Sequence, residues 1–186
     1  MSLLPLIIAE VKTASPFWYR STETWETLFE VAHTVWDIIS IHTDSRWWWS
    51  MELISRAKQL TDKPILAKGI HSQDSEILEA LKRGAEYILI VWRIPEIHRD
   101  KCFIEPNTLK ELEEFASILW WDWKFVWNSR DLKTWGLKIE TFQDARNIFP
   151  WWLCQASNIK TTSDIISWAS AILVWTHLKE FSKTML

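Results

Sequence analysis

Runs of apolar residues with strand character alternate along the chain with stretches of helical spacing. Several runs are almost unbroken, such as Tyr87 to Ile94, which is typical of strands buried on both faces of a parallel sheet. Seven strands are predicted, over residues 7–12, 37–43, 64–70, 87–94, 124–128, 152–156 and 171–175. The alternation predicts an α/β fold, a barrel of the (β/α)8 type in which one βα unit is missing.

The first of these runs carries charge. Glu10 and Lys12 lie two residues apart, so their side chains leave the same face of a strand. The run then breaks at Ser15-Pro16. In a barrel of this type the strand ends and the loops that follow them build the active site, so we expect both charges to point into one site.

Composition narrows the class of protein. With 186 residues, 48% of them hydrophobic, the chain can form one compact barrel domain over residues 1–186. Its net charge of −3 argues against a nucleic-acid partner, and no apolar run approaches the length of a membrane span. Met1 to Pro5 lacks the features of a signal peptide, and Cys102 and Cys154 lack CxxC spacing, so we expect a cytoplasmic protein.

Tryptophan and glycine are present in abnormal numbers. The chain has 16 Trp and 3 Gly, whereas an ordinary chain of this length carries about 13 Gly. The five histidines show no metal-ligand spacing, and we interpret them as structural or surface residues: His33, His42, His71, His98 and His177. We therefore predict no metal site.

Four motifs follow one another in order at predicted strand ends. They are Ile8 to Pro16 (IAEVKTASP), Pro64 to Lys68 (PILAK), Asn128 to Leu132 (NSRDL) and Ala171 to Val174 (AILV). Together they resemble indole-3-glycerol phosphate synthase of tryptophan biosynthesis, over about residues 5–178. The resemblance implies a carbon–carbon lyase (a carboxy-lyase) without metal or organic cofactor. Its substrate would be an anthranilate-linked sugar phosphate, 1-(2-carboxyphenylamino)-1-deoxyribulose 5-phosphate, on which it closes an indole ring with loss of carbon dioxide and water.

The resemblance also assigns roles. Lys68 is the implied general acid, and Lys12, held by Glu10, binds the reacting region and is a second candidate for proton transfer. Asn128 and Arg130 are expected to hold polar groups of the substrate, including its carboxylate.

The remaining implied site residues follow the first and the last two strands. Ser157 would bind the substrate, and the phosphate would be bound by Ser15, Asn158, Trp175 and Thr176. The family also suggests association with other enzymes of the tryptophan pathway.

The chain departs from the family pattern at two sites. The family has a strand that ends in its general-base Glu and is followed by a helix, and no such unit is recognisable between the helix at 109–119 and the strand at 124–128. The family's Glu-Ser-Gly is Ala156-Ser157-Asn158 here, with Gln155 as a candidate replacement for the carboxylate. Three alternatives follow: a non-catalytic sugar-phosphate-binding barrel, a barrel that acts only with a partner chain, and another phosphate-binding barrel lyase or isomerase.

Many tryptophans occupy positions where the family has glycine. Trp48, Trp49 and Trp175 stand at or beside such turns, and Trp127 lies near another. Glycine serves there because the backbone must approach a phosphate or adopt positive φ. We hypothesise that most of these residues are glycine in the organism's own protein, encoded by UGA codons that mean glycine and were read here as tryptophan. The alternatives are deliberate Gly-to-Trp substitution and an unusual natural barrel.

Overall fold

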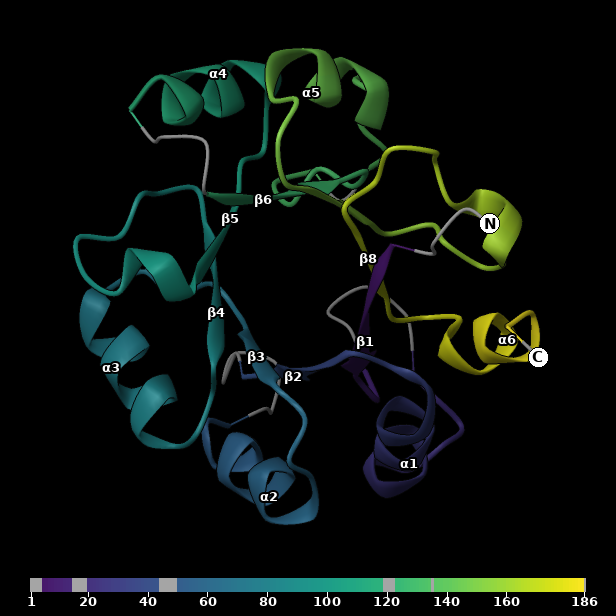
Figure 1. The fold of residues 1–186 in the computed structure, drawn as a ribbon. Coiled ribbons are helices and arrows are strands. Elements are labelled where there is room, and N and C mark those ends of the chain that lie inside the picture. The colour runs from purple at the N-terminus through teal and green to yellow at the C-terminus, as the bar shows by residue number, and fades with distance from the viewer. Residues whose placement is uncertain (1–4, 15–19, 44–49, 119–122, 135, 186) are drawn as a thin grey trace.

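A ring of parallel strands forms the centre of the molecule. In the computed structural model, which describes residues 5–14, 20–43, 50–118, 123–134 and 136–185, eight strands close into a barrel in the order of the sequence (Figure 1). They are β1 (Leu6–Val11), β2 (Ile38–His42), β3 (Ile65–Lys68), β4 (Tyr87–Val91), β5 (Cys102–Glu105), β6 (Lys124–Asn128), β7 (Leu153–Ala156) and β8 (Ala171–Val174). The predicted (β/α)8 barrel is confirmed.

The prediction of seven strands with one βα unit missing was wrong. Strand β5 pairs in parallel with β4 and β6, and it is followed by helix α4 (Leu109–Ile118). The sequence had predicted this helix at 109–119 but had failed to reveal strand β5, so its unit was counted as missing. The connection between β4 and β5 differs from the other strand-to-strand connections of a (β/α)8 barrel. It contains a 3-10 turn at Arg99–Lys101 in place of an α-helix.

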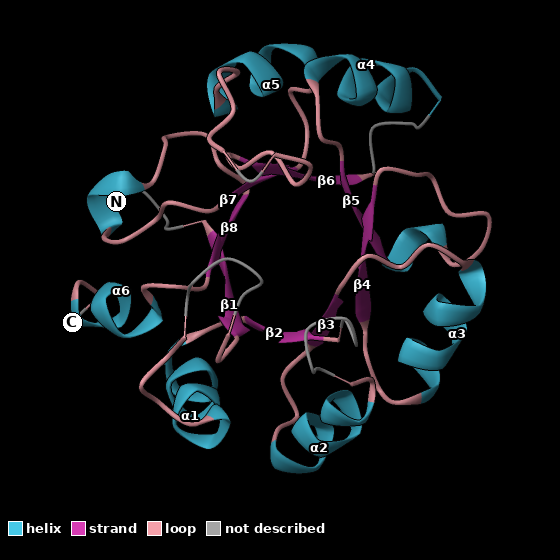
Figure 2. Cartoon of the chain, turned by 180° about the vertical axis from the view of Figure 1, so that it is seen from behind, coloured by secondary structure: helices cyan, strands magenta, loops and turns pink. Residues whose placement is uncertain are grey.

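Helices cover the outside of the ring (Figure 2). Besides α4, the described residues form α1 (Trp25–Val35), α2 (Glu52–Leu60), α3 (Asp74–Lys82), α5 (Phe142–Ile148) and α6 (Leu178–Lys183). Helix α1 shows why such segments fold: the Thr24 side chain accepts the Thr27 N–H at 3.2 Å as an N-cap, while Leu28, Phe29 and Ala32 are buried. No helix of the described ranges is long and apolar enough to cross a membrane.

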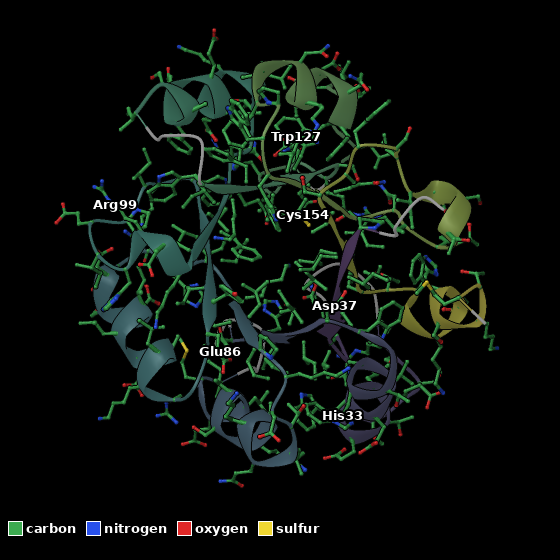
Figure 3. All side chains as sticks on the ribbon, viewed as in Figure 1. His33, Asp37, Glu86, Arg99, Trp127 and Cys154 are labelled. Atoms are coloured by element: carbon green, nitrogen blue, oxygen red, sulfur yellow. The ribbon has the colours of Figure 1, made fainter. Side chains whose placement is uncertain are left out.

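The alternation of side chains along each strand produces two apolar layers. Trp127 on β6 belongs to the layer between the strands and the helices, and Cys154 on β7 belongs to the layer inside the ring (Figure 3). Ile8, Leu66 and Phe103 are further members of the inner layer. The interior of the barrel toward the amino ends of its strands is therefore a packed core. Polar side chains are left for the carboxyl ends of the strands.

Polar residues just before three strands fix the strand register. The Asp37 carboxylate accepts the N–H of Ile7 at 2.8 Å, and the Glu86 carboxylate accepts the N–H of Ile65 at 2.7 Å (Figure 3). The Ser170 hydroxyl accepts the N–H of Leu153 at 3.2 Å. Each bond satisfies a backbone donor at the start of the preceding strand.

Candidate active site at the carboxyl ends of the strands

Five polar side chains occupy the last inward positions of five strands. They are Glu10 on β1, His42 on β2, Lys68 on β3, Glu105 on β5 and Asn128 on β6. Four of them are buried, and Lys68 is partly exposed. Polar groups gathered at this end of a (β/α)8 barrel are the usual sign of a reactive site.

Glu10 is the centre of an ion cluster. Its carboxylate lies 3.4 Å from Lys68 Nζ and 3.9 Å from Lys12 Nζ. Burial raises the pKa of Glu10, but the Lys68 and Lys12 ammonium groups outweigh burial, so the pKa lies below its usual value. Glu10 is therefore ionised at neutral pH and pairs with two ammonium groups at the mouth of the barrel.

Glu105 is a functional candidate that the sequence reasoning missed. It ends β5 with a side chain that is 2% exposed, and Asn128 Nδ2 donates a hydrogen bond to its Oε1 at 2.9 Å. Asn128 Oδ1 in turn accepts from the Ser157 hydroxyl at 2.7 Å. The available signal was the short apolar run Cys102-Phe103-Ile104 directly before a carboxylate and a predicted helix.

The two carboxylates act together on Lys68. Burial lowers the pKa of Lys68, but Glu10 and Glu105 outweigh that effect and the pKa lies above its usual value. Lys68 is therefore protonated at neutral pH. The site can present an ammonium donor and a carboxylate acceptor to one bound molecule.

Arg130 borders a pocket beside this cluster. The pocket has a volume of about 50 Å³, and its lining includes Arg130, Asn158, Trp175 and Thr176. Arg130 Nη2 lies 3.4 Å from Asn158 Oδ1, while Arg130 Nε is buried without a hydrogen-bond partner among the described residues. A buried guanidinium donor of this kind suits an anionic group.

The neighbouring Asp131 stabilises the loop that carries Arg130. Its carboxylate accepts from the Lys133 N–H at 2.7 Å and from Asn107 Nδ2 at 3.1 Å. These hydrogen bonds lower the pKa of Asp131 to about 2. The Arg130 guanidinium is thus left for the pocket.

The other predicted site residues fall into three groups. Trp175 closes one side of the site, with its ring centroid 4.6 Å from Lys12 Nζ. Gln155 does not replace the family's carboxylate, because its amide binds the backbone of Asp164 and Ile166 outside the barrel. Ser15 lies outside the described residues, as do Trp48 and Trp49. In the described part of the chain, no cluster of His, Cys, Asp and Glu could hold a metal ion.

Comparison with known proteins gives two related enzymes. No family model matches the chain. It is 31% identical over 116 residues to an indole-3-glycerol phosphate synthase from Campylobacter concisus (strain 13826), an alignment that covers 61% of this chain and 41% of that protein. It is 36% identical over 91 residues to the indole-3-glycerol phosphate synthase from Campylobacter curvus (strain 525.92), covering 46% of this chain and 34% of that protein. The similarity thus spans less than half the length of each relative.

Proposed function

We propose that this barrel is a carboxy-lyase that closes the indole ring of indole-3-glycerol phosphate. The observation that carries the proposal is the position of Lys68 at the barrel mouth. Its ammonium group lies 3.4 Å from the Glu10 carboxylate, and the carboxylates of Glu10 and Glu105 both raise its pKa. The partial similarity to two synthases of this activity supports the same reaction. The substrate would be the anthranilate-linked ribulose phosphate named above.

The reaction needs two protons delivered to the ketone oxygen and one proton removed from carbon. A ring carbon attacks the ketone carbon, and the carboxylate on that ring carbon then leaves as carbon dioxide. We assign Lys68 to protonate the ketone oxygen, because its raised pKa keeps it in the ammonium form. The resulting hydroxyl takes a second proton, which we assign to the Lys12 ammonium group, and leaves as water while a proton is removed from the carbon beside the nitrogen. We assign Glu105 to remove that proton, which makes it the general base that the family places at this strand end.

The surrounding residues would bind and orient the substrate. Lys12, paired with Glu10, would bind the reacting region, and Asn128 would position Glu105 through their 2.9 Å hydrogen bond. Arg130 and Ser157 would bind the polar groups of the substrate. The phosphate would occupy the pocket formed by Asn158, Trp175 and Thr176, with Ser15 as a further ligand.

A non-catalytic sugar-phosphate-binding barrel is the second candidate. One observation favours it: the inward residue at the end of β7 is Ala156, where the resemblance places the Glu of the family's Glu-Ser-Gly. Such a protein would bind the substrate without turnover.

A turnover assay separates the two candidates. The chain and its Trp175→Gly variant are incubated with the substrate, and formation of the indole product is followed by its absorbance. Lys68→Ala is expected to lower the rate at least about 100-fold, the lower range for loss of a general acid. Lys110→Ala is the matched control, because the side chain of that lysine is 84% exposed and pairs with Glu114 on the outer helix α4. If neither parent protein forms product above its Lys68→Ala background, the enzyme proposal is wrong, and calorimetric binding of the substrate would then support the binding-only barrel.

A further inference from the structure

His42 occupies an inward position in the middle of the ion cluster. It is the last residue of β2, is 7% exposed, and lies opposite Lys68 in the register of β2 and β3. Strand β1, which carries Glu10 and is followed by Lys12, is its other neighbour. The roles assigned above make no use of this imidazole.

Two N–H donors bind the carbonyl oxygen of Lys68, and the Thr43 hydroxyl, which also contacts His71, lies beside them. The Thr43 N–H lies 2.8 Å from the carbonyl oxygen, His42 Nδ1 lies 2.9 Å from it, and the Thr43 hydroxyl lies 3.3 Å from it. A carbonyl oxygen can only accept, so His42 Nδ1 must carry a proton. The backbone from which the Lys68 side chain extends is thereby held by β2.

The same contacts continue to β4. Thr43 Oγ1 lies 3.2 Å from His71 Nε2, and His71 Nδ1 lies 2.7 Å from the carbonyl oxygen of Leu89. All of these groups are buried or partly buried. Leaving a buried polar group without its partner costs free energy of folding. These contacts therefore hold the end of β3 against β2 on one side and β4 on the other.

The charged groups around His42 favour its neutral form. Glu10 faces it from β1, Lys12 from the residue that follows β1, and Lys68 from β3. Burial lowers the pKa of His42 to about 4; Glu10 opposes this shift, and the Lys12 and Lys68 ammonium groups add to it. A protonated imidazole would compete with both ammonium groups for the Glu10 carboxylate.

We propose that His42 is a positioning residue for Lys68, whose neutral imidazole holds the end of β3 through Nδ1–H and leaves Glu10 to pair with the two lysines. The inference rests on the proposed function in one respect: the loss of kcat expected below requires that Lys68 act as the general acid. It assigns His42 no contact with the substrate.

Two substitutions test the role of the Nδ1 donor. In His42→Asn the amide nitrogen can take the place of Nδ1 and donate to the same carbonyl, whereas His42→Leu has similar volume and no donor. We expect His42→Leu to lower kcat about 10- to 100-fold with KM changed less than about 3-fold, since misplacing a reacting group by 1 Å can cost about 100-fold. His42→Asn should remain within about 3-fold of the parent kcat, because it keeps the donor. A parental kcat in His42→Leu, or an equal loss in both variants, would refute the proposal.

A further variant and a spectroscopic measurement cover the remaining outcomes. If His42→Leu does not fold, His42→Gln takes its place, because its amide lies one carbon farther from the backbone and cannot match Nδ1; the same loss of kcat is expected. ¹⁵N NMR of histidine-labelled protein, with the signal assigned by its loss in His42→Asn, should show protonated Nδ1 and unprotonated Nε2 at neutral pH. A doubly protonated ring or the opposite tautomer would refute the proposal even if the parent chain has no turnover, so its failure is distinguishable from failure of the proposed function.

Discussion

Trp168 allows a direct test of the hypothesis that glycine is the natural residue at some tryptophan positions. It is the third residue of a turn closed by a 3.1 Å hydrogen bond from the Ala169 N–H to the Ile166 carbonyl oxygen, and its φ is 84°. The third position of a type II turn requires φ near this value and strongly prefers glycine. Its side chain is 72% exposed, so packing gives little reason for an indole there.

The backbone contribution can be separated from loss of the ring by comparing two replacements. Trp168→Gly and Trp168→Ala both remove the indole, but only alanine keeps a Cβ in the left-handed region, at a cost of about 1–2 kcal/mol. The greater freedom of glycine in the unfolded chain opposes this by about 0.4–1 kcal/mol. Trp168→Gly should therefore be more stable than Trp168→Ala by about 1 kcal/mol, or about 2–4 °C in Tm for a chain of this size.

Trp151 is the matched control. It is 56% exposed, it does not share the positive φ, and its carbonyl oxygen, like that of Trp168, accepts a hydrogen bond from Arg146. At this position the order should reverse, with Trp151→Gly less stable than Trp151→Ala by about 0.5–1 kcal/mol. Urea unfolding followed by circular dichroism gives all four free energies of unfolding. Trp168→Ala as stable as Trp168→Gly would contradict the reasoning, and a UGG codon for residue 168 in the gene would exclude the codon explanation there.

Three further predictions concern the site. Glu105→Gln should lower kcat at least about 100-fold in the turnover assay with a small change in KM, as expected for a general base; a parental kcat would exclude that role. Arg130→Gln should raise KM about 10-fold or more through loss of a charge-assisted hydrogen bond, and competition by inorganic phosphate shows whether the phosphate is the group that it binds. His42 should destabilise the protein in acid: because the pKa of His42 is depressed from 6.5 to about 4, the unfolded chain takes up its proton first as pH falls from 6.5. The loss of stability should reach about 3 kcal/mol by pH 4, and urea unfolding of the parent and of His42→Asn should diverge over this interval.

The strands that the sequence revealed are those with long apolar runs. Residues 87–94 read as a strand because the run is nearly unbroken, and β4 is found there as Tyr87–Val91. Strand β5 was hidden because a polar 3-10 turn, instead of a helix, precedes it and because Pro106 follows it directly. Pattern reasoning needs several turns of a helix or several alternations of a strand, and this segment provides neither.

The candidate site was predictable only as far as its strands were recognised. Glu10, Lys68 and Asn128 belong to recognisable motifs, and the structure brings them to one end of the barrel. Glu105 was missed together with its strand. The contact of His42 with the Lys68 carbonyl depends on the register of β2 and β3, and nothing in residue spacing within a single strand encodes the register between two.

The tryptophans that flank β8 connect the composition of the chain to its chemistry. Trp168 precedes this strand and adopts a backbone conformation that suits glycine, and Trp92, which follows β4, shares a positive φ of 64°. Trp175 follows β8, where its ring lines the Arg130 pocket and lies against Lys12. An indole in that place narrows the pocket and lies against the ammonium group of Lys12 in a cation–π contact. Glycine at 175 would leave both the pocket and Lys12 open to an anion, so the same codon hypothesis predicts a change in stability at 168 and a change in ligand binding at 175.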